Sequence, residues 1–104
     1  GRALGQVPRY FTERDARDLI GRRVQARVTL SRHWLRDLGL WIGSGSLGTV
    51  TQLAFGPDRD RFLVGVHWDD PRPAIPRRPN YPIDWYTEDE YRTLLGAALE
   101  ARAA

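Results

Sequence analysis

Three glycines between residues 42 and 50, in the segment IGSGSLGTV, have the spacing of a phosphate-binding loop. Gly43, Gly45 and Gly48 fit G-x-G-x-x-G, and Val50 extends the match to the glycine-rich loop that covers ATP in protein kinases. Kinase and P-loop sites both need a lysine that contacts the phosphates. This chain contains no lysine, because all 16 of its basic residues are arginines.

A dinucleotide site is also disfavoured by the segment on the C-terminal side of the glycines. Such a site needs a helix whose N-terminus faces the pyrophosphate. The segment after Gly48 is TVTQLAF, which is β-branched and typical of a strand. We therefore predict a structural loop with no nucleotide and no other cofactor, in which Gly48 is required by close packing or by an unusual φ angle.

The segment HWDD at residues 67–70 contains side chains that bind zinc or iron, with His33 as a further candidate ligand. His67 alternates with apolar residues along a predicted strand and so should face solvent, while Asp69 and Asp70 precede a proline as turn residues do. Ser44 and Ser46 show no histidine or aspartate spacing that marks a triad. We predict neither a metal nor a catalytic site, and an enzyme or metal-binding protein is the third hypothesis.

Aromatic residues and arginines form the strongest functional pattern. Two tryptophans lie in a long loop after the first predicted strand, and three further aromatics flank the fourth. The candidate partner-binding groove is Trp34, Trp41, Tyr81, Trp85 and Tyr86, and its candidate basic rim is Arg22, Arg23, Arg27, Arg32 and Arg36. Aromatics with arginines suit a protein surface, and they equally suit single-stranded nucleic acid. Because a small domain also needs large side chains in its core, each tryptophan, Trp68 above all, is alternatively a core residue.

The charge is unevenly distributed along the 104 residues. The formal net charge is +3, and residues 1–36 contain nine arginines against three acidic residues. The absence of lysine, methionine and cysteine beside abundant arginine, alanine and glycine is typical of GC-rich codon usage. Arginine content alone is therefore weak support for nucleic-acid binding. No apolar run of about 18 residues occurs, so we predict no membrane span and a cytoplasmic location.

The first elements that must position these residues are a short helix and a strand. Thr12 is a good N-cap, with Asp15 three residues later, and Phe11 with Ala16 forms a candidate hydrophobic staple. Gly21 supplies the helix stop. In the next segment the apolar residues alternate, which predicts a strand with Val24, Ala26, Val28 and Leu30 on its buried face.

Three more strands are predicted beyond the long loop at 31–46. They cover about 47–55, 62–68 and 83–86, and the segment GPDRDR makes a tight turn between the first two. A proline-rich crossover separates the last two; its PAIPRR matches a polyproline II ligand motif, and we interpret it as a stiff connection. Thr87 and Glu90 form a capping box ahead of an apolar stripe, which predicts a C-terminal helix of about 12–16 residues.

This order of elements resembles a small SH3-like barrel. The resemblance rests on Gly21-Arg22-Arg23-Val24, Gly48-Thr49-Val50 and Val64-Gly65-Val66-His67-Trp68-Asp69, similar to the short motifs of KOW and Tudor modules, Mind-bomb-type repeats and nitrile hydratase β-subunit barrels. It covers about residues 21–86 and implies a mainly β barrel there. The N-terminal extension with its short helix (1–20) and the amphipathic C-terminal helix packed on the barrel (87–104) lie outside the match and complete a single predicted domain. Such motifs support a fold more strongly than an activity.

The resemblance, together with the aromatic residues and arginines, predicts a non-enzymatic interaction module or accessory subunit with a protein partner. An arginine-rich nucleic-acid-binding barrel is the alternative hypothesis. The two differ in salt dependence, because phosphate contacts release counterions.

Overall fold

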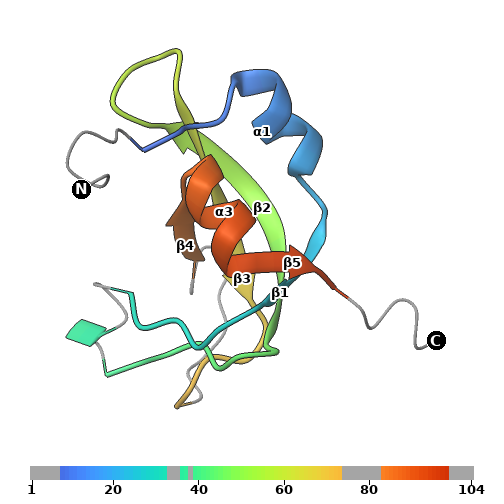
Figure 1. Cartoon of the computed structure of the whole chain (residues 1–104), viewed down its shortest axis with the longest axis vertical. Coiled ribbons are helices and arrows are strands. Elements are labelled where there is room, and N and C mark those ends of the chain that lie inside the picture. The colour runs from blue at the N-terminus through green and yellow to red at the C-terminus, as the bar shows by residue number, and fades with distance from the viewer. Residues whose placement is uncertain (1–7, 33–35, 38, 74–82, 99–104) are drawn as a thin grey trace.

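The computed structural model describes residues 8–32, 36, 37, 39–73 and 83–98, which form a curled five-stranded antiparallel half-barrel with two short helices (Figure 1). The elements are α1 (Glu13–Leu19), β1 (Arg23–Ala26), β2 (Leu47–Phe55), β3 (Phe62–Trp68), β4 (Ile83–Tyr86), α3 (Glu88–Leu94) and β5 (Leu95–Ala97). The strand order is β4-β3-β2-β1-β5. The predicted mainly β class is confirmed, and the curled sheet is compatible with a small barrel.

The β2–β3 hairpin has the predicted boundaries and turn. Asp58 closes the turn by accepting the N–H of Asp60 at 2.9 Å and the guanidinium of Arg61 at 2.6 Å. The register shifts between Val50 and Gln52, which marks a β-bulge. Such a bulge increases the local twist of the strand, which favours a curled sheet over a flat one.

The first strand is shorter than predicted. Val24, Ala26 and Leu30 are buried as expected, but β1 ends at Ala26 and the Val28 residue is 46% exposed. The chain bends at residues 27 and 28 and resumes pairing at Leu30, which exchanges two backbone hydrogen bonds with Ile42. The bend interrupts the alternation of inward and outward side chains, so the prediction for Val28 is wrong.

Helix α1 begins and ends as its sequence predicts. The Thr12 hydroxyl accepts the N–H of Asp15 at 3.1 Å, and Phe11 and Ala16 are both buried. After the helix, Gly21 has a φ of 95°, a conformation that favours glycine and turns the chain towards β1. Within the described ranges, no helix is long and apolar enough to cross a bilayer.

The C-terminal segment differs from the predicted long helix. The capping box of Thr87 and Glu90 is present, but α3 ends at Leu94 after seven residues. Leu95 has an extended backbone, with φ −120° and ψ 159°, and starts β5, which pairs antiparallel with β1. The pairing covers the edge of β1 and continues just beyond it with a hydrogen bond of 2.8 Å from the Arg27 N–H to the Leu94 carbonyl. Leu95 is buried in β5, which pairs with β1, and the chain is extended where the spacing of apolar residues predicted further helical turns.

The core is a single cluster of buried side chains from the strands, from α1 and from the segments between them. Trp68 and Tyr86 are its largest fully buried side chains, so the alternative interpretation of Trp68 as a core residue is the correct one. The smaller members of the core are Phe11, Ala16, Val24, Ala26, Leu30, Leu40, Ile42, Val50, Phe62, Val64, Val66 and Leu95.

The glycine segment is a loop that leads into β2. Gly45 has a φ of 90°, and Ser46 donates its N–H to the Gly43 carbonyl at 3.0 Å, which closes the turn. Gly48 does not have a positive φ, and it pairs with Trp68 across the β2–β3 hairpin. A Cβ atom at Gly48 would lie 2.9 Å from Trp68 Cε3 and 3.0 Å from the His67 carbonyl oxygen. Close packing, and not an unusual φ angle, is therefore the reason for this glycine.

We expect Gly48→Ala to lower the free energy of unfolding by about 2 kcal/mol, because overpacking against a buried ring and a backbone carbonyl forces both to move. Gly43→Ala is the matched control, since its Cβ would meet only Ser46 Oγ at 3.8 Å. Urea unfolding of the two variants measures the difference. Equal midpoints for both would show that the contact around Gly48 relaxes without cost.

Candidate functional site

The five predicted groove aromatics do not form one surface in the described structure. Trp34 and Tyr81 lie outside the described residues. Tyr86 is 0% exposed and belongs to the core, so it cannot line a groove. Trp85 is half-buried with its ring against Gly65 of β3, where a Cβ would be 3.0 Å from the indole. Trp41 is 46% exposed.

Trp41 and Arg36, one groove residue and one rim residue, lie together at a surface hollow. They line a shallow hollow of about 500 Å³ with Thr29, Ser31, Gly39 and Leu40. The Arg36 guanidinium donates to the Ser31 carbonyl at 3.4 Å. Of the predicted groove aromatics, Trp41 is the one that lines this hollow.

Arg32, a predicted rim residue, instead holds a polar network against the core. Its Nε lies 2.9 Å from Asp84 Oδ2, and its guanidinium is 3.0 Å from Glu90 Oε2 and lies over the Tyr86 ring at 4.6 Å. Burial lowers the pKa of Arg32, but the hydrogen bond to Glu90 and the charges of Asp84 and Glu90 outweigh it and raise the pKa above its usual value. Burial, and then the charge of Asp84, raises the pKa of Tyr86. Arg32 is therefore a structural residue.

The two edge strands of the sheet are each covered by an arginine. On β4, the Trp85 carbonyl accepts Arg32 Nη2 at 2.7 Å, while the Trp85 N–H is bonded to Asp84 Oδ1. On β5, the Leu95 carbonyl faces away from β1 and accepts Arg27 Nε at 2.8 Å. The Arg27 guanidinium crosses Gly96 to reach it, because a Cβ there would lie 3.1 Å from Nε. These contacts occupy backbone groups that another strand would need.

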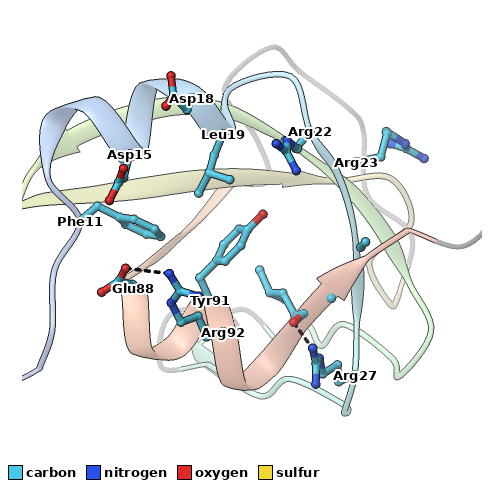
Figure 2. Close-up of a pocket in the computed structure, with 13 residues that line it drawn as sticks. Phe11, Asp15, Asp18, Leu19, Arg22, Arg23, Arg27, Glu88, Tyr91 and Arg92 are labelled. Carbon is cyan, nitrogen blue, oxygen red and sulfur yellow. Dashed lines mark hydrogen bonds and ion pairs between the residues drawn. The ribbon is translucent and has the colours of Figure 1, made fainter.

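A cleft between α1 and the α3–β5 segment is the candidate site that contains most of the predicted rim arginines (Figure 2). Its volume is about 510 Å³. Three predicted rim arginines line it, together with residues of both helices and of β5. The lining comprises Phe11, Asp15, Asp18, Leu19, Arg22, Arg23, Arg27, Glu88, Tyr91, Arg92, Leu95, Gly96 and Ala97.

The floor of this cleft is apolar and belongs to the core. Phe11 and Tyr91 meet edge to face, with ring centroids 5.7 Å apart and an interplanar angle of 79°. Leu19 and Leu95 extend the apolar surface on either side. A backbone hydrogen bond from Glu88 to the Arg9 carbonyl, at 2.9 Å, holds the start of α3 to the segment before α1. The two walls of the cleft are thus fixed relative to each other by packing and by backbone contacts.

The polar groups of the cleft differ in how fully they are satisfied. Arg23 forms an ion pair with Asp69 at 2.7 Å, and Arg92 with Glu88 at 3.1 Å. The Arg22 guanidinium has no hydrogen bond or ion pair with any residue that the structure describes, and neither has the Tyr91 hydroxyl. Burial raises the pKa of Tyr91, and the nearby charges of Arg22 and Arg92 partly oppose this. The Tyr91 hydroxyl is therefore a neutral donor beside a guanidinium.

The candidate metal ligands do not form a cluster in the described ranges. No group of three or more histidine, cysteine, aspartate or glutamate side chains gathers there, and His33 lies outside them. Asp69 is engaged by Arg23, and the Ser44 hydroxyl donates to the Arg27 carbonyl at 3.2 Å. The PAIPRR motif also lies almost entirely outside the described residues.

Sequence reasoning missed the aromatic half of this cleft. The sequence patterns predict a staple for Phe11 and a helix stripe for Tyr91, and each interpretation places the ring against protein. The sequence shows that Phe11 directly precedes one N-cap, Thr12, and that Tyr91 lies one helical turn after the other N-cap, Thr87. The contact between the two rings depends on tertiary structure. Comparisons of the chain with protein-family models, curated proteins and solved structures gave no match.

Proposed function

We propose that this chain is a non-enzymatic interaction module of the SH3-like barrel class, and that a protein partner binds in the cleft between α1 and α3. One observation carries the proposal: the Arg22 guanidinium and the Tyr91 hydroxyl lie at a cleft with an apolar floor, without partners among the described residues. Arginine and tyrosine at an apolar surface are among the side chains most enriched at binding hot spots. Two polar groups that can hydrogen-bond to a ligand fix the orientation of that ligand in the cleft and make binding specific.

The mixed charge of the cleft favours a protein over a nucleic acid. Asp15, Asp18 and Glu88 line it together with four arginines. A phosphate backbone would meet repulsion from these carboxylates, and two of the arginines are already ion-paired. Arg32 of the predicted basic rim is also committed to the fold.

We expect peptides selected from a random display library on the full chain to lose at least about tenfold in affinity with Ala97→Trp, because the added indole fills the cleft. Thr51→Trp is the matched control, since Thr51 is exposed on β2 and does not line the cleft. Isothermal titration of synthesised peptides gives the affinities. Binders that tolerate Ala97→Trp would place the interaction elsewhere.

A nucleic-acid arm of the same experiment tests the alternative. Single-stranded oligonucleotides should bind weakly, with a log–log salt slope of about −1, since a slope of roughly −0.7 is expected for each neutralised phosphate. Tight and steeply salt-dependent binding would instead favour the arginine-rich nucleic-acid binder. Replacing Arg23 and Arg27 together by glutamate would then abolish that binding.

A further inference from the structure

Glu88 and Arg92, which both line the cleft, form an ion pair with each other, and the other charges of the lining are separated along its length. Asp15 and Asp18 lie on α1 at one end, while Arg22, Arg23 and Arg27 lie towards β1 and β5 at the other (Figure 2). Each end carries charge without a partner among the described residues: the two aspartates at one, Arg22 at the other. The apolar floor lies between these two ends.

Asp18 and Arg22 have the i, i+4 spacing at which an acid and a base pair on a helix. They do not pair here, because α1 ends at Leu19 and Gly21, with its φ of 95°, redirects the chain before Arg22. The nearby pair of Glu13 and Arg17, which has the same spacing within the helix, does close at 2.6 Å. The helix end thus leaves two opposite charges of one cleft unpaired with each other.

We infer that the occupant of the cleft is a short extended segment of a protein partner with an acidic and a basic residue on either side of an apolar one. Its carboxylate would accept hydrogen bonds from Arg22 and the Tyr91 hydroxyl, and its cation would face Asp15 and Asp18. The apolar side chain would cover Phe11 and Leu19. This inference rests on the proposed function and adds the charge order that the partner must carry.

Side chains, and not strand addition, would hold this segment. The outward carbonyl of Leu95 on β5 is occupied by Arg27, which lies across Gly96. A partner strand would have to displace this guanidinium to pair with the edge. Recognition by charge and by apolar contact is therefore the mode that the cleft allows, and opposite charges at its two ends also fix the direction of the bound chain.

The test uses peptides selected from a random display library on the full chain and then synthesised. Replacing the acidic residue of a bound peptide by its amide should lower affinity about fivefold to tenfold, as should Arg22→Gln, because each removes a charged hydrogen bond at a partly exposed site. Applied together, the two changes should cost little more than either alone, since both break one interaction. Arg14→Gln is the control, because Arg14 is exposed on α1 and does not line the cleft. An Asp15→Asn, Asp18→Asn variant should likewise lose its preference for peptides with a basic residue.

Two contrary outcomes are distinguishable. The first is that Ala97→Trp abolishes peptide binding while the acid-to-amide change and Arg22→Gln leave the affinity unchanged. This outcome would overturn the charge order and leave the proposed function intact. Peptides that bind despite Ala97→Trp, or a selection that yields none, would overturn both. Additive losses from the peptide and Arg22 changes would show that the carboxylate contacts another residue, which also contradicts the inferred charge order.

Discussion

Replacing Arg32 by methionine is expected to lower the free energy of unfolding by about 3 kcal/mol, because it removes one partner of a buried ion pair. Asp84 is 3% exposed, and it would keep its carboxylate in the core without the guanidinium 2.9 Å away. Methionine retains much of the apolar volume of the arginine stem, so the loss reports mainly on charge. Urea unfolding at neutral pH measures it.

Two controls separate this effect from a general loss of arginine. Arg17→Met removes an exposed i, i+4 pair with Glu13 and should cost less than about 0.5 kcal/mol. Adding Asp84→Asn to Arg32→Met should restore part of the stability, since the amide is uncharged. Equal losses for Arg32→Met and Arg17→Met would show that the buried network is not stabilising.

Cutting the chain after Tyr86 is expected to abolish cooperative unfolding. The cut removes α3 and β5, and with them the buried Leu95, the Tyr91 ring against Phe11 and the Glu90 contact to Arg32. It also exposes the backbone edge of β1 that β5 covers. A domain of this size has a free energy of unfolding of only about 5–10 kcal/mol, and burying one leucine contributes about 2–3 kcal/mol of it. Thermal unfolding followed by circular dichroism measures the transition.

Cutting after Ala98 provides the control, because it keeps every contact that the structure describes. Leu95→Ala gives a graded test and should cost about 2–4 kcal/mol through lost burial and the cavity it leaves. A chain ending at Tyr86 with an unchanged midpoint would mean that the C-terminal segment is an appendage and not part of the folding unit.

The strongly patterned elements could be predicted from the sequence because their signals are local. The boundaries of β2 and β3 are set by alternating apolar residues around a turn centred on Asp58, and both helix starts are set by threonine caps. The end of α3 could not be predicted in this way. Leu94 and Leu95 fit a helix stripe and a strand equally well, and the open edge of β1, which lies some 70 residues earlier, decides between them.

The candidate site shows the same division more sharply. The absence of lysine excluded lysine-dependent phosphate binding, and the order of residues placed the excess of arginine near the N-terminus. Whether an arginine is available to a ligand is a property of its neighbours in space: Arg32 is consumed by Asp84 and Glu90, and Arg27 by a backbone carbonyl, whereas Arg22 remains at the cleft. The sequence by itself determined the strands, the helix caps and the supply of charge, because these depend on residues close together along the chain. Only the tertiary structure decided which aromatic rings are core and which arginines are committed to ion pairs, because burial and ion pairing depend on contacts between distant segments.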